Sequence, residues 1–200
     1  PTTSSYNLFG IRYAHFQKFF TDFRYYIPLG ERSKLVYRLA GGIGVPRQNL
    51  KEALPFEKSF FSGGANGMRA WRARSLGPGS FYDSQNRFDK IGDVQLEGNV
   101  ELRFPVISWV EGAFFIDAGN VWLINDDPLR PGGKFTKSFL NDIAIGSGLG
   151  IRMDLDFFVI RLDVGIPIRN PAIQMNDSDN DFKPWIFDSY KGNEKRFFDY

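Results

Sequence analysis

The sequence contains no cysteine and only one histidine, His15. The absence of cysteine excludes disulfide bridges, a thiolate nucleophile and cysteine-ligated zinc. A single histidine provides neither a multi-histidine metal site nor a serine–histidine relay, so we expect no catalytic residue, metal or cofactor. Neither sign of charge is in large excess. The chain has 25 lysines and arginines and 23 aspartates and glutamates, for a net charge of +2. Nucleic-acid binders carry a clustered basic face, so we expect no nucleic-acid partner.

Long hydrophobic runs are missing as well. No stretch approaches the roughly 18 consecutive apolar residues that a transmembrane helix needs. The first residues, PTTSSYN, have neither the basic start nor the apolar core of a signal peptide, and we therefore expect a piece of a longer precursor. Aromatic residues by contrast reach 16%, and 21 phenylalanines accompany 21 glycines, which favours β structure. Composition leaves open whether the β structure is soluble or a membrane barrel, because the hydropathy of alternating strands averages out.

Apolar and polar residues alternate without interruption from Gly92 to Phe104, over about 13 residues. Leu96 and Val100 fall on the apolar face, and Gln95 and Asn99 fall on the polar face. At about 3.3 Å per residue and a tilt near 45°, such a strand rises roughly 30 Å, enough for the apolar band of a membrane barrel.

Five further stretches show the same alternation, at residues 18–27, 34–43, 110–118, 142–153 and 158–166. Each has one apolar face and one face of charged residues, glycine and alanine, so we predict six antiparallel strands. The predicted connections are short turns at 28–32, 105–108 and 154–156, and long loops at 46–91, at 123–140 and after the last strand. Short turns at one end and long loops at the other are typical of an outer-membrane barrel. A soluble β-sandwich would explain the alternation, but neither the strand length nor the asymmetry of the loops.

The loop at 46–91 is too rich in aromatic and apolar residues for a disordered linker. Its middle reads FFSGGANGMRAW, in which Gly63 and Gly64 permit sharp turns and the aromatic side chains require a surface to pack against. We predict that this loop folds back into a cavity and packs there.

This loop and a later strand carry two motifs that resemble those of the BamA/TamA superfamily, the barrel proteins that insert or export proteins at the Gram-negative outer membrane. The loop tip of that family reads (V/I)-R-G-(F/Y), which Met68, Arg69, Ala70 and Trp71 match at the arginine and the aromatic position. Ala70 stands where the family has glycine. The second motif, F-x-D-x-G, is present as Phe115, Asp117 and Gly119.

The resemblance implies a fold and a role for the whole chain. Residues 1–200 would be the C-terminal part of one outer-membrane barrel of about sixteen strands, with upstream strands, periplasmic POTRA modules and the last strand absent. The implied function is non-enzymatic assembly, insertion or translocation of proteins in the Gram-negative outer membrane. The implied partners are membrane lipid, client proteins, and periplasmic or inner-membrane proteins bound through upstream modules.

Two other functions remain open. A two-partner-secretion-like pore or a passive channel would use the same barrel without assembling clients. A barrel-scaffold enzyme is disfavoured, because the sequence offers no nucleophile constellation.

Strand parity places Glu101, Phe115 and Asp117 on the polar faces, which point into the lumen if the apolar faces meet lipid. The resemblance implies that the loop arginine, Arg69, pairs with Asp117 first and Glu101 second. A guanidinium can bind a carboxylate through two parallel hydrogen bonds, which would fix the loop's orientation. The alternative is a solvated Arg69 above carboxylates that merely line the lumen.

Three weaker motifs are disfavoured as sites. The glycine-rich run 62–67 lacks the Lys-Ser/Thr ending of a phosphate loop. The acidic segment 177–188 has calcium-loop spacing at its first three aspartates, but Phe182 and Asp188 replace the glycine and glutamate of that motif. We expect a solvated acidic loop there. Pairs of acidic residues on the strands are expected to line a lumen rather than perform acid–base chemistry.

Overall fold

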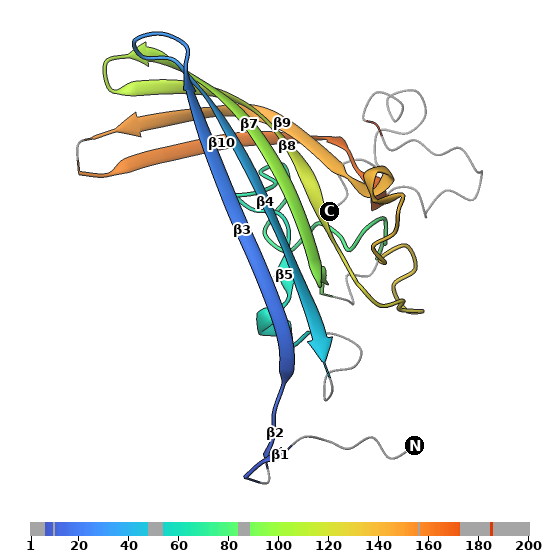
Figure 1. The fold of residues 1–200 in the computed structure, drawn as a ribbon. Helices are drawn as coiled ribbons and strands as arrows, with labels where there is room; N and C mark the ends of the chain where they lie inside the picture. Colours follow the sequence, from blue (N-terminus) through green and yellow to red (C-terminus); the bar gives the residue numbers. More distant parts are fainter. Residues whose placement is uncertain are drawn as a thin grey trace.

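The computed structural model describes residues 7–9, 11–47, 54–83, 89–155, 157–172 and 185, which form a strongly curved antiparallel sheet with loops packed against it (Figure 1). The six long strands are β3 (His15–Pro28), β4 (Lys34–Arg47), β7 (Val94–Ile107), β8 (Val110–Trp122), β9 (Ala144–Asp154) and β10 (Val159–Arg169). They lie in the order β3-β4-β7-β8-β9-β10. The prediction of six antiparallel strands is therefore confirmed.

The remaining elements are short. Strands β1 (Asn7–Leu8) and β2 (Ile11–Arg12) pair with each other, as do β5 (Phe60–Phe61) and β6 (Ile91–Gly92), and the 3₁₀ turns are η1 (Phe56–Lys58) and η2 (Phe139–Asp142). Among the described residues, none of the helices has the length and apolarity needed to cross a membrane.

Several predicted boundaries were wrong, since β4 extends to Arg47, β8 extends to Trp122 and β9 begins only at Ala144. Two further differences have a clear structural cause. The alternation placed Gly92 and Asp93 inside the third strand, but Gly92 belongs to β6 and β7 begins at Val94. The Asp93 carboxylate instead accepts hydrogen bonds from the loop amides of Leu54 and Ile124, at 3.4 and 3.1 Å. The predicted turn at 105–108 is shorter than expected, because β7 continues to Ile107 through a register shift in its pairing with β8. A bulge of this kind tolerates a proline inside a strand.

The exposure of the sheet is the inverse of that in a water-soluble protein. Large apolar side chains cover one face and are open to the surroundings, with Phe114 44% and Leu149 64% exposed. Charged side chains lie on the other face under the loop, with Glu97 3% and Asp117 0% exposed. A soluble sandwich would bury the apolar face, whereas a membrane barrel presents it to lipid.

The connections divide between the two ends of the sheet, as predicted. The β3–β4, β7–β8 and β9–β10 turns lie at one end, whereas the β4–β7 and β8–β9 connections leave the other end (Figure 1). The segment 54–83 within the β4–β7 connection packs on the charged face of the sheet. This loop folds inward, which confirms the prediction.

The exposed apolar outer face determines how the 200-residue chain should behave in solution on its own. In water it should aggregate, because the exposed apolar side chains form a patch far larger than soluble monomers carry. In detergent it should stay dispersed. Sedimentation velocity with and without detergent measures both states. A monodisperse, cooperatively unfolding species without detergent would contradict the assignment of the outer face to lipid.

Candidate functional site

The tip of the inward loop is a compact turn shaped by two glycines. Gly63 and Gly64 have φ angles of 101° and 94°, a region that side-chain-bearing residues rarely adopt. The Gly64 amide donates to the Trp71 carbonyl at 2.8 Å, and the Trp71 amide donates to the Met68 carbonyl at 3.1 Å. These bonds close the segment 64–71 into a compact turn that contains Arg69.

Apolar packing holds the loop against the sheet. Met68, Trp71 and Leu76 are buried together with Ala144, the first residue of β9. Met68 is wholly inaccessible to solvent. Burial of three large side chains of this kind is worth several kcal/mol, at about 1.5–3 kcal/mol each. The loop is thus an ordered segment packed against the sheet, and its apolar side chains are not exposed to solvent.

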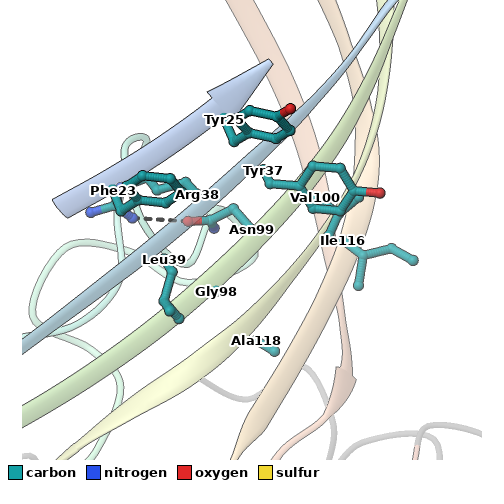
Figure 2. Close-up of a pocket in the computed structure, with 10 residues that line it drawn as sticks. All are labelled: Phe23, Tyr25, Tyr37, Arg38, Leu39, Gly98, Asn99, Val100, Ile116 and Ala118. Carbon is teal, nitrogen blue, oxygen red and sulfur yellow. Dashed lines mark hydrogen bonds between the residues drawn. The ribbon is translucent and has the colours of Figure 1, made fainter. Parts of the chain in front are cut away.

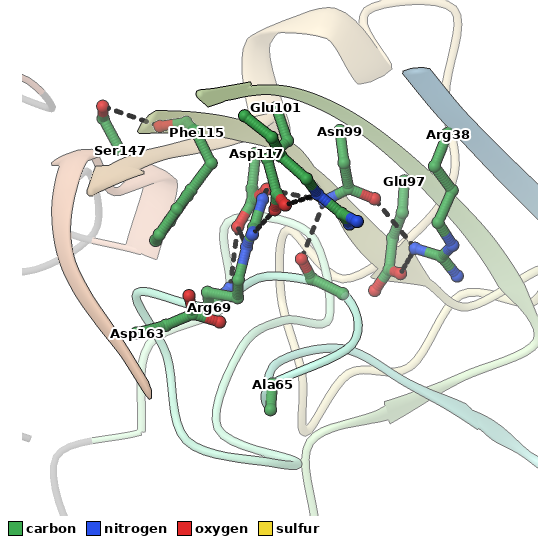
Figure 3. A network of polar contacts seen from close by, with 12 residues as sticks. Arg38, Ala65, Arg69, Glu97, Asn99, Glu101, Phe115, Asp117, Ser147 and Asp163 are labelled. Atoms are coloured by element: carbon green, nitrogen blue, oxygen red, sulfur yellow. Dashed lines mark hydrogen bonds and ion pairs between the residues drawn. The ribbon is translucent and has the colours of Figure 1, made fainter. Parts of the chain in front are cut away.

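Arg69 forms the predicted contact with the lumen wall (Figure 3). Its guanidinium donates to Asp117 on β8 through Nε at 2.9 Å and through Nη2 at 2.7 Å, and its backbone amide donates to the same carboxylate at 3.0 Å. Nη1 donates to Glu101 on β7. The Arg69 side chain is 5% exposed, so the alternative of a solvated arginine is wrong.

The guanidinium of Arg69 also stacks on an aromatic ring. Its central carbon lies 3.5 Å from the centroid of Phe115, which is fully buried on β8. A cation over an aromatic face gains electrostatic attraction as well as van der Waals contact. The F-x-D-x-G motif therefore supplies both the surface under the arginine, Phe115, and its carboxylate, Asp117.

The motif's last residue, Gly119, has a different role. A Cβ atom at Gly119 would lie 2.5 Å from the Leu96 carbonyl oxygen and 2.9 Å from the Glu97 Cα on β7. Gly119 thus allows β8 to approach the β7 backbone next to the site. None of the three atoms nearest to this Cβ position belongs to the loop tip.

Asn99 belongs to the site, although its lumen-facing parity was the only indication of this in the sequence. Its amide nitrogen donates to Asp117 at 2.7 Å and to the Gly67 carbonyl at 2.8 Å, and its amide oxygen accepts from Arg38 at 2.8 Å. Asn99 therefore ties the loop backbone to the same carboxylate that binds Arg69. Asp117 therefore accepts hydrogen bonds from three groups, namely the Arg69 guanidinium, the Arg69 backbone amide and the Asn99 side-chain amide. Its negative charge is well compensated.

Ion pairs extend this contact across the whole sheet. On one side, Arg38 of β4 pairs with Asp22 of β3 at 2.8 Å and Glu97 of β7 at 3.2 Å. Ser62 in the loop donates to the same Glu97 at 2.8 Å. A carboxylate thus occupies the space beside the glycine-rich run 62–67, which agrees with the rejection of a phosphate loop there.

On the other side, Arg152 of β9 connects two more strands. It donates to Glu101 on β7 at 3.1 Å and to Asp163 on β10 at 2.6 Å. Asp163 also accepts from Arg161 at 2.6 Å, and Arg161 donates to the loop carbonyl of Ala65. The acidic residues that could be considered as acid–base pairs are all engaged by arginines, namely Glu97, Glu101, Asp117 and Asp163. Buried pairs of this kind are costly to break, because the remaining partner is left uncompensated.

Glycines in β9 and β10 receive the loop tip. A Cβ atom at Gly146 would lie 2.7 Å from the Cβ of Ala70 and 3.0 Å from the Trp71 ring, and one at Gly165 would lie 3.0 Å from the Ala70 Cα. Gly146 and Gly165 thus form a glycine notch under the tip. Ala70 is not among the residues of positive φ, so its backbone has no need for the glycine found in the related motif.

The close fit at the glycine notch predicts that a larger side chain at Gly146 will disturb the loop tip. Gly146→Val should displace the loop tip and lower the free energy of unfolding by about 1–3 kcal/mol, as overpacking does. Gly41→Ala is the matched control, because a Cβ there meets its nearest atoms at an ordinary 3.7 Å. Limited proteolysis of the loop and urea titration in vesicles measure the two effects. Equal results for both variants would contradict the close fit of the tip.

The fold and site together define a class of protein. A sheet with an apolar outer face, whose charged inner face holds a long loop through a buried arginine, is the wall of an outer-membrane β-barrel with an inward-folded loop. The model of the Omp85 superfamily domain matches residues 1–183, and the chain belongs to that superfamily. The resemblance to BamA/TamA-type barrels is thereby confirmed at the level of the superfamily. Its members are outer-membrane β-barrel proteins of Gram-negative bacteria that serve protein insertion or secretion.

The possible calcium loop at 177–188 lies outside the described residues, apart from Trp185.

Proposed function

We propose that this chain is part of the barrel of a non-enzymatic factor that assembles or translocates proteins at the outer membrane. Its inward loop, described over residues 54–83, is the functional element, and Arg69 is the residue that fixes it to the wall. The supporting observation is the two-point hydrogen bonding of Arg69 to Asp117, reinforced by Glu101 and Phe115. A passive pore has no need of a buried ion pair inside its lumen, because solvated lining charges already suffice for conduction.

The same proposal includes the rest of the protein and its binding partners. Residues 1–200 are the C-terminal part of a barrel of about sixteen strands, preceded in the whole protein by further strands and periplasmic modules. Its partners are outer-membrane lipid, unfolded client proteins, and periplasmic or inner-membrane proteins that bind the upstream modules. Nucleic acid is not among them, since the arginines of the site are matched by carboxylates.

A two-partner-secretion-like pore is the second candidate. The loop lies within the lumen and is held there by polar contacts, which a secretion pore could release to open a path. The two candidates differ in what they do to a client, since an assembly factor leaves it folded in the membrane and a pore passes it through.

One reconstitution separates these functions. The whole protein in phospholipid vesicles is given an unfolded client barrel, and folding of the client is followed by its heat-modifiable electrophoretic mobility. We expect faster client folding than in empty vesicles, and no steady conductance in a planar bilayer. Steady conductance without accelerated folding would favour the passive channel. Transfer of a soluble client into the vesicle would favour the secretion pore.

A further inference from the structure

The outer face of the sheet carries a depression that the proposed function does not use. It has a volume of about 700 Å³ and an almost wholly apolar lining, and it spans strands β3, β4, β7 and β8 (Figure 2). Its floor is formed by Gly98 and Ala118, which pair directly across β7 and β8. We name it the Gly98 groove.

Gly98 has no internal reason to be glycine. It is not among the residues of positive φ, and a Cβ placed on it would meet a single atom, the Ala118 carbonyl oxygen, at 3.9 Å. The lumen-facing glycines differ, because Gly146 and Gly165 are covered by the loop tip. The space above Gly98 is therefore left open by the protein on the face that meets lipid.

The neighbouring side chains turn this space into a groove with two tyrosine rings at one end. Tyr25, Tyr37, Val100 and Ile116 form a row across the four strands, each paired with the next, and this row lies on the side of the floor nearer the short turns. Both tyrosines are lining residues of the groove (Figure 2). Leu39 and Phe23 border the floor on β4 and β3.

The position of the tyrosines along their strands sets the depth of this end of the groove in the membrane. Tyr25 is three residues from the end of β3 at Pro28, or about 10 Å along the strand. Tyrosines at this depth sit at the membrane interface, where their rings meet acyl chains and their hydroxyls meet polar groups. The ester groups of a glycerophospholipid lie at the same interface, and a carbonyl there can accept a phenolic hydrogen bond.

We propose that the Gly98 groove binds one acyl chain of a glycerophospholipid from the leaflet at the short-turn end. The chain lies over Gly98 and Ala118, and an ester carbonyl accepts a hydrogen bond from Tyr25 or Tyr37. This inference goes beyond the proposed function and depends only on the membrane location of the outer face. A failure of client assembly would leave it standing.

Native mass spectrometry of the whole protein tests this site. The protein is reconstituted in nanodiscs of phosphatidylethanolamine and phosphatidylglycerol, transferred to detergent, and examined for retained phospholipid. Gly98→Leu fills the floor and should lower the retained fraction about tenfold, since about two methylene groups of contact are lost. Val164→Leu is the matched control, because it enlarges an outer-face side chain on β10, which does not line the groove. It should retain lipid like the unchanged protein.

A second variant keeps the test independent of packing. Tyr25→Phe combined with Tyr37→Phe removes only the two hydroxyls and should lower retention about fivefold, the value of one neutral hydrogen bond. Equal retention in the unchanged protein, the glycine variant and the tyrosine variant would overturn the proposal. Retention of a second protein chain in place of lipid, lost on Gly98→Leu, would also overturn it and assign the groove to a protein contact.

Discussion

Arg69→Ala should impair client assembly more severely than any other single substitution in the loop. The change removes the two bonds to Asp117, the bond to Glu101 and the stacking on Phe115 at once. Breaking a buried pair costs about 3–5 kcal/mol, and a partly hydrated lumen should reduce this to about 2–3 kcal/mol. The undocked fraction of the loop then rises roughly 30- to 150-fold. Client folding in vesicles measures the functional loss, and protease cleavage of the loop measures the undocking.

Asp117→Ala should be milder than Arg69→Ala, because Arg69 retains Glu101 and Phe115. The double variant should be little worse than Arg69→Ala alone, as expected for residues that act on each other. Arg24→Ala is the control, since this arginine is more than half exposed and pairs with Asp22 outside the loop contact. Additive losses in the double variant, or a control as damaging as Arg69→Ala, would refute the assignment of the site.

Leu96→Arg should destabilise the embedded protein by about 2–4 kcal/mol, which is the cost of a lipid-facing arginine near the midplane. Leu96 lies on the apolar outer face of β7, four residues or about 13 Å further from the short turns than Val100, which pairs with Tyr37. The lumen-facing control is Gln95→Arg. It should cost within about 0.5 kcal/mol, because an arginine can keep donating to the Phe61 carbonyl and the Glu97 carboxylate as the Gln95 amide does. Equilibrium unfolding with urea in vesicles gives both values.

Equal costs at Leu96 and Gln95 would contradict the assignment of the two faces. Asn99, the other polar position of this strand considered from the sequence, is unsuitable as a control. Its amide bonds to Asp117, Gly67 and Arg38, so an arginine there would disturb the loop contact itself.

The two faces of the sheet could be predicted from the sequence because lipid imposes a strict rule. Every second residue must be apolar over the full membrane thickness, and this left a regular alternation in all six strands. Parity alone then placed Glu101 and Asp117 in the lumen. The motif resemblance supplied the remaining step, the pairing of these carboxylates with an arginine that lies far away in the sequence.

The partners within the lumen could not be predicted in the same way. Alternation assigns a residue to a face, but the neighbour that it meets depends on the register between strands. Asn99 stands opposite Asp117 only because β7 and β8 pair in the observed register. The role of Gly146 depends on the path of a loop that no periodicity describes. The interruption at Asp93 was missed because its cause, two loop amides, lies outside the strand.

The glycine notch and the carboxylates of the site also dictate an order of events during folding. The loop tip precedes β7–β10 in the chain, yet its seat combines Glu101 of β7, Asp117 of β8, Gly146 of β9 and Gly165 of β10. Its full set of contacts therefore requires that these four strands have paired. A one-residue slip of any of them would turn its charges towards lipid, and a two-residue slip would separate the groups that Arg69 joins. The complete binding surface for the loop tip thus exists only in a correctly registered barrel wall.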